Sequence, residues 1–98
     1  MYAVIFRAEI NKIDNEYLSI ANTMRELALS EYNCIEFTSS TEGNKEIAIS
    51  YWKSKQDIKA WKENEKHKKA QEAGKAKYYK SYKVQIVEIQ HEYKSHNK

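Results

Sequence analysis

The residues best suited to chemistry follow Trp61 in the segment WKENEKHKKAQEAG. Asn64, His67 and Gln71 succeed one another at spacings of three and four, which place them on one face of a helix. Imidazole and amide groups can both donate hydrogen bonds to a ligand and accept them, and burying these groups without a partner costs stability. The segment therefore predicts either a polar site lined by these three side chains or a half-helix in solvent, anchored by Ile58 and Trp61.

Metal and disulfide chemistry find little support in the sequence. Cys34 is the only cysteine, so neither an intrachain disulfide nor a cysteine-based zinc site is expected. The three histidines, His67, His91 and His96, form no compact ligand cluster. We expect no metal site.

One long helix should carry the polar face. Ser54 can cap it by accepting a hydrogen bond from the amide of Asp57, whose negative charge suits a first helical turn. Gly74 is expected to end it in the left-handed conformation that glycine adopts easily. The sequence thus predicts a continuous helix from Ser54 to Gly74.

The flanking segments read as four strands and one further helix. Alternation of apolar residues predicts strands over 2–10, 33–41, 46–53 and 82–93, and apolar residues at helical spacing predict a helix over 15–30. The short turn Glu42–Lys45 makes the second and third strands antiparallel neighbours. The order β-α-β-β-α-β indicates an α+β fold of the ferredoxin-like type.

Two helices cover one face of a four-stranded sheet, yet several strands carry apolar residues on both faces. The other face then needs a cover, and the same face of a second copy supplies it. We therefore predict a homodimer packed sheet to sheet.

Length and composition set further limits. The 98 residues suffice for one domain, expected over residues 1–93, with a polar tail over 94–98. No signal peptide or membrane-spanning segment is evident, so we expect a cytoplasmic protein that does not contact membranes. The window 53–83 holds 11 lysines and 4 acidic residues, a net charge of +7, which a solvated helix face explains more simply than an anionic partner.

Several short motifs follow one another along the chain: Tyr51-Trp52, Ser54-x-x-Asp57-Ile58-x-Ala60-Trp61, His67-x-x-Ala70-Gln71-x-x-Gly74, Tyr79-x-x-Tyr82 and Val87-x-x-x-x-x-Tyr93. Together with the element order, they resemble the antibiotic biosynthesis monooxygenase family. The resemblance covers nearly the whole chain and implies a dimeric α/β barrel built from two ferredoxin-like units, in agreement with the prediction of a homodimer packed sheet to sheet.

The resemblance implies an oxygenase that oxidises a small electron-rich aromatic, a phenol or quinol, with O2 and without a cofactor. In that reading His67 is the general base, and Gln71 and Asn64 orient the substrate. Trp61, Tyr51, Trp52 and Tyr79 are the expected aromatic walls, although Trp61 also suits the core.

Three alternatives remain open. Haem-degrading relatives carry a histidine ten residues after the helix tryptophan, where this chain has Gln71, so haem is disfavoured as a cofactor. RNA-binding domains share the element order, but the third strand, KEIAISYW, lacks their aromatic motif, and no nucleic-acid partner is expected. A dimeric module that binds a small molecule without catalysis remains the third.

Overall fold

The computed structural model describes residues 1–96, which form a four-stranded sheet and helices in the order β-α-β-β-α-α-β. This confirms the α+β ferredoxin-like fold, with the second helix in two pieces. The elements are β1 (Tyr2–Ile10), α1 (Asn15–Glu31), β2 (Glu36–Glu42), β3 (Lys45–Trp52), α2 (Lys55–Glu63), α3 (Glu65–Ala73), a π-helical turn (Gly74–Tyr78) and β4 (Tyr79–Glu88).

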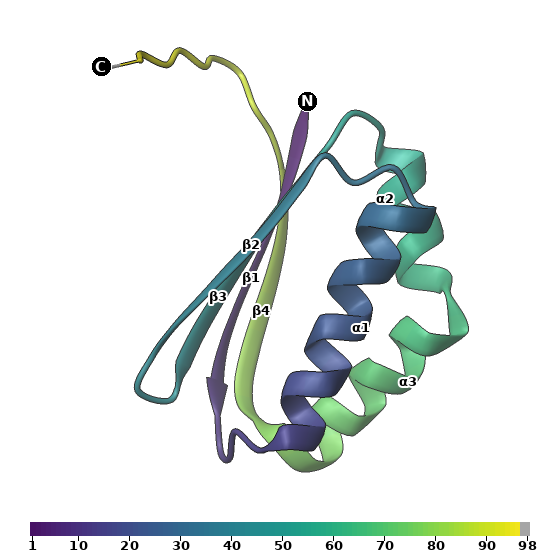
Figure 1. Cartoon of the computed structure of the whole chain (residues 1–98), viewed down its shortest axis with the longest axis vertical. Coiled ribbons are helices and arrows are strands. Elements are labelled where there is room, and N and C mark those ends of the chain that lie inside the picture. Colours follow the sequence, from purple (N-terminus) through teal and green to yellow (C-terminus); the bar gives the residue numbers. More distant parts are fainter. Residues whose placement is uncertain (97–98) are drawn as a thin grey trace.

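The sheet is antiparallel throughout, with the strand order β2-β3-β1-β4. The helices α1, α2 and α3 all lie on one of its faces (Figure 1). Pairing of Ile5 with Ile49, and of Ala3 with both Tyr51 and Val87, places an apolar row on the other face. Within residues 1–96 no helix covers that row.

Two apolar clusters join the helices to the sheet. One holds Trp52, Ile58 and Trp61, and Trp52 is completely buried, with its ring 5.3 Å from that of Trp61. The other lies around Tyr17 and Tyr78, whose ring centroids are 5.2 Å apart. The space between the clusters is only partly filled, and the candidate site lies there.

The predicted continuous helix from Ser54 to Gly74 is wrong, because the helix breaks at Asn64. This residue has the extended dihedral angles φ −60° and ψ 138°, and its side chain accepts a hydrogen bond from the amide of Lys66 at 2.8 Å. Asparagine is a poor residue inside a helix and a good N-cap, so it ends α2 and begins α3. Ser54 caps α2 as expected, but its partner is the amide of Gln56 rather than that of Asp57.

The predicted left-handed conformation of Gly74 at the helix end is wrong. Its φ of −59° and ψ of −50° are right-handed, and the chain continues into the π-helical turn. A Cβ atom at Gly74 would lie 2.8 Å from Cδ2 of Tyr79, well inside normal contact. Glycine is therefore required for space beside the Tyr79 ring.

We expect Gly74→Ala to lower the free energy of unfolding by about 1–3 kcal/mol, because the Tyr79 ring must move to admit the methyl group. Gly43→Ala is the matched control. Gly43 has φ +62° with nothing near its Cβ position. Gly43→Ala should therefore lower the free energy of unfolding by about 1–2 kcal/mol through backbone strain alone. Urea denaturation measures both, and ligand affinity separates them, since only Gly74→Ala disturbs Tyr79. Unchanged stability in Gly74→Ala would contradict the close contact.

The ends of two strands also differ from the prediction. The strand predicted over 82–93 runs from Tyr79 to Glu88. It pairs with β1, the one strand beside it among residues 1–96, and this pairing extends from Tyr2 with Glu88 to Ile10 with Tyr79. The strand predicted from residue 33 begins at Glu36, since Asn33 has φ +61° and the amide of Cys34 still bonds to Ala28 at the end of α1. Residues 89–96 form no helix or strand, and the last two residues of the tail predicted over 94–98 lie outside the described chain.

Candidate active site

A cavity of about 340 Å3 lies between the sheet and the helices, because residues of both line it. Its size suits one small organic molecule. Every strand, α1 and α3 contribute to its lining, so most of the fold is needed to build it. The aromatic walls are Phe6, Tyr17, Phe37, Tyr79 and Tyr82.

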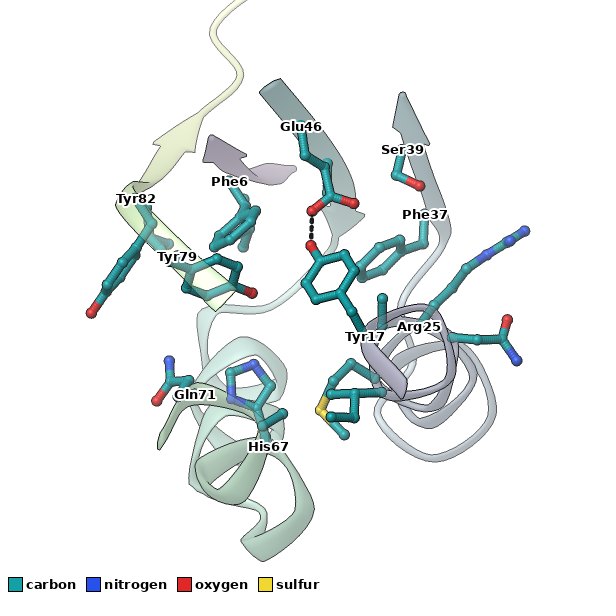
Figure 2. A pocket seen from close by; sticks show the side chains of 18 of the residues that line it. Phe6, Tyr17, Arg25, Phe37, Ser39, Glu46, His67, Gln71, Tyr79 and Tyr82 are labelled. Atoms are coloured by element: carbon teal, nitrogen blue, oxygen red, sulfur yellow. Dashed lines mark hydrogen bonds between the residues drawn. The ribbon is translucent and has the colours of Figure 1, made fainter. Parts of the chain in front are cut away.

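The polar side chains of α3 reach this cavity. His67 and Gln71 lie one helical turn apart, and Figure 2 shows both near the Tyr79 ring. The imidazole packs edge-on against the Trp61 indole, with ring centroids 4.4 Å apart and an interplanar angle of 76°. Trp61 donates its own N–H to the carbonyl of Met24 at 3.2 Å, so the indole that supports His67 is itself fixed.

Burial gives His67 unusual acid–base properties. Desolvation, followed by the positive charge of Lys62, lowers the pKa of His67 to about 4. Its Nδ1 is buried and has no hydrogen-bond partner among residues 1–96. The imidazole is therefore neutral at neutral pH. Since an anion bound beside it would favour the imidazolium, its basicity should increase as such a charge develops.

A second polar group enters the cavity from the sheet. Glu46 of β3 is half-buried, and its Oε2 accepts a hydrogen bond from the hydroxyl of Tyr17 on α1 (Figure 2). Burial and then this hydrogen bond raise the pKa of Tyr17. Burial and then the charge of Glu46 raise the pKa of Tyr79 to about 12. Both phenols therefore remain protonated and can donate hydrogen bonds inside the cavity.

Three of the seven residues predicted for the site line this cavity: His67, Gln71 and Tyr79. Asn64, Trp61, Tyr51 and Trp52 are absent from its lining in the described chain. Asn64 instead caps α3 and donates from Nδ2 to the Tyr32 hydroxyl at 3.0 Å. Trp61 and Trp52 belong to the core, and Tyr51 lies on the opposite face of the sheet, in register with Ala3.

Tyr17 and Glu46 line the cavity but are not among the predicted site residues, although the sequence carries a signal for each. Tyr17 lies on the apolar stripe of α1, and a buried tyrosine normally finds a partner for its hydroxyl. Glu46 shares its sheet face with Ala48, Ser50 and Trp52 by the two-residue period of a strand, so its carboxylate had to point toward the helices. The sequence therefore indicates that both side chains face inward, but not that they meet.

Other kinds of site receive no support from the part of the chain that the structure describes. Residues 1–96 contain no group of three or more His, Cys, Asp or Glu side chains arranged to hold a metal ion. Among the helices within this range, none has the length and apolar character needed to span a membrane.

A model of the family called antibiotic biosynthesis monooxygenase matches residues 1–73, about three quarters of the chain. The chain belongs to this family. The resemblance noted from the motifs is therefore confirmed. Another similar sequence is the uncharacterized protein YqjZ of Bacillus subtilis strain 168, which is 32% identical over 89 residues, 90% of this chain and 78% of that protein.

Solved structures agree with the membership in the antibiotic biosynthesis monooxygenase family at the level of the fold. SnoaB, a cofactor-independent oxygenase from Streptomyces nogalater, superposes with a TM-score of 0.78 at 11% identity over 93% of this chain and 94% of its own. A conserved protein from Methanosarcina mazei Go1 gives a TM-score of 0.76 at 14% identity over 88% and 89% of the two chains. At these identities the likeness extends to the fold alone.

Proposed function

We propose that this protein is a cofactor-independent oxygenase that oxidises a small electron-rich aromatic, a phenol or quinol, with O2. The observation that carries the proposal is the cavity itself, which combines five aromatic walls with a neutral, buried imidazole. SnoaB, a cofactor-independent oxygenase of the same fold, supports this choice of chemistry.

The chemistry needs no external reductant. A quinol and O2 together supply all the atoms and electrons for a hydroxyquinone and one water: one oxygen atom enters the ring and the other leaves as water. The ring must become electron-rich enough to give an electron to O2, and removing a hydroxyl proton achieves this. No cofactor is required in this scheme.

We assign the role of general base to His67. Its neutral imidazole can accept the hydroxyl proton, and the aromatic anion formed beside it would stabilise the resulting imidazolium. To Gln71, which lines the cavity one turn along α3, we assign the donation of a hydrogen bond to the same oxygen. Tyr79 adds a phenol that stays protonated, so the developing anion lies near a hydrogen-bond donor rather than near a second anion.

We expect metal-stripped protein to accelerate O2 uptake with at least one member of a panel of hydroquinones and polyphenols. His67→Ala should reduce the catalysed rate by about a hundredfold or more, the range for loss of a general base. His91→Ala, in the exposed tail, is the matched control and should act as wild type. Uptake retained in His67→Ala would move the base elsewhere. Absence of uptake with every compound, together with tight binding of one, would favour the non-catalytic binding module.

We also propose that the protein works as a homodimer whose two sheets pack against each other. The apolar row on the helix-free face includes Ile5, Ile49 and Tyr51, each half-buried in the single chain, and Val87, which is 37% exposed. A second copy of this face would remove these groups from water, at a gain of about 25 cal/mol per Å2 of apolar surface. For location we propose the cytoplasm, a reducing compartment that suits the lone thiol of Cys34.

A further inference from the structure

The Tyr17–Glu46 pair has no role in the reaction as proposed above, yet it lies in the same cavity. Its carboxylate projects from β3 toward the helices, in a row across the sheet with Thr41 of β2 and Ala8 of β1. The one ion pair found among residues 1–96 joins Lys77 to Glu16, so no cation within 4 Å neutralises Glu46. A half-buried carboxylate with neither a cation nor full solvation calls for a hydrogen-bond donor.

The hydrogen bond from Tyr17 satisfies only part of this need. It engages Oε2 of Glu46, and the other carboxylate oxygen accepts no hydrogen bond from the described chain. Tyr17 is itself fixed, because it is 4% exposed and packs against Tyr78 and Tyr79 at centroid distances of 5.2 and 6.3 Å. Figure 2 shows the pair opposite His67, across the cavity. One acceptor oxygen is thus held by a rigid phenol while the other remains available.

We propose that Glu46 is a substrate-contacting, specificity-determining residue that accepts a hydrogen bond from a hydroxyl group of the ligand, with Tyr17 as its positioning residue. The carboxylate makes the cavity select neutral hydroxyl compounds over anionic ones. A neutral hydroxyl satisfies the unpaired acceptor, whereas a phenolate or carboxylate at this end of the cavity, across from His67, would place two like charges together at low dielectric.

The other charged and titratable groups around the cavity bear on this selection. Arg25 of α1 and Lys62 of α2 are cations and would attract an anion, but Arg25 is exposed and extends away from Glu46 (Figure 2). Lys62 acts on His67, whose pKa it lowers. Tyr79, whose pKa is raised to about 12 by burial and then by the charge of Glu46, and Tyr82 line the cavity from β4. Glu46 is the group that decides the charge preference at the sheet side.

The inference rests on the proposed function only for the class of ligand, an aromatic hydroxyl compound, so binding is tested without O2 chemistry. The probe is 4-nitrophenol, which is too electron-poor for facile oxidation by O2 and whose absorbance distinguishes phenol from phenolate. The titration is done at a pH equal to the pKa of the free probe. The variants are Glu46→Gln, Tyr17→Phe and the matched control Glu42→Gln, which removes the same charge from an exposed position at the end of β2.

We expect wild type to bind the neutral form at least tenfold more tightly than the phenolate, so the phenolate colour fades on binding. Glu46→Gln should abolish this preference and weaken binding of the neutral form by about tenfold. The preference of Tyr17→Phe for the neutral form should lie between those of wild type and Glu46→Gln, and Glu42→Gln should behave as wild type. The methyl ether 4-nitroanisole, which cannot donate, should bind wild type and Glu46→Gln equally.

Three results would overturn the proposal. The first is no detectable binding of neutral nitrophenol to wild type, and the second is the same charge preference in Glu46→Gln as in wild type. The third is that Glu46→Gln loses affinity equally for nitrophenol and for its methyl ether. Circular dichroism of each variant shows whether it is folded. O2 uptake is a separate readout. Wild type that accelerates O2 uptake but shows no preference for neutral nitrophenol contradicts only the role of Glu46. Wild type that shows this preference but accelerates O2 uptake with no compound contradicts only the oxygenase.

Discussion

Trp52→Ala is expected to lower the free energy of unfolding by about 3–5 kcal/mol, the usual cost of truncating a buried tryptophan. Trp52 is 0% exposed and packs on Trp61, and its N–H donates to the Ser50 hydroxyl at 2.8 Å. Ser50 is itself 2% exposed, so the substitution also leaves its hydroxyl without this partner. Native domains have only about 5–15 kcal/mol of stability, so this loss removes a large share of the total. Urea denaturation followed by circular dichroism measures the loss.

Two further variants define the cause of that loss. Trp52→Phe keeps much of the apolar volume and should lose clearly less stability than Trp52→Ala. Tyr93→Ala removes an aromatic ring that is 86% exposed and should change the free energy by no more than about 0.5 kcal/mol. A loss below about 1 kcal/mol in Trp52→Ala would mean that Trp52 is not part of the core.

The second large effect is expected on assembly. Ile49→Lys places a charge at the middle of the helix-free face, where Ile49 pairs with Ile5 on one side and Thr38 on the other. If two sheets meet there, the lysine would be buried without a partner and should raise the dimer dissociation constant roughly hundredfold or more. Sedimentation equilibrium at micromolar concentration should then give a dimer for the wild type and a monomer for the variant.

Ala60→Lys is the control, since it adds the same side chain at an exposed position on α2. It should remain dimeric. A wild type that is monomeric at micromolar concentration would contradict the dimer itself. A dimer that survives Ile49→Lys would place the interface on another surface.

The fold could be predicted because its signals are periodic and redundant. Alternation along β1 and β3 and the apolar stripe of α1 repeat over several residues, so a single exception changes little. The break at Asn64 was missed for the opposite reason. It depends on one asparagine that caps a helix within a segment of otherwise good helix formers, and the hydrogen bond to Tyr32 that fixes it comes from a residue 32 positions away.

The candidate site could be predicted only in part. His67 and Gln71 share a face with a four-residue spacing, which survives the break because both lie in α3. Trp52 and Trp61 were assigned as walls because their aromatic character suits a ligand as well as a core, and only packing distinguishes the two. Tyr17 and Glu46 are 29 residues apart, and their contact depends on how α1 lies over β3, which no local pattern specifies.

The break at Asn64 also separates two helices, α2 and α3, that differ in how firmly they are held to the core. Ile58 and Trp61 hold α2 in the core, whereas α3 has no fully buried side chain, although it carries His67 and Gln71. Segments with little buried apolar surface open locally at a small fraction of the global unfolding free energy. We therefore expect this nine-residue element, which lines the cavity, to open locally more readily than the sheet and α2. A ligand enclosed there could exchange with solvent through this partial opening, at a rate set by α3 rather than by the stability of the domain.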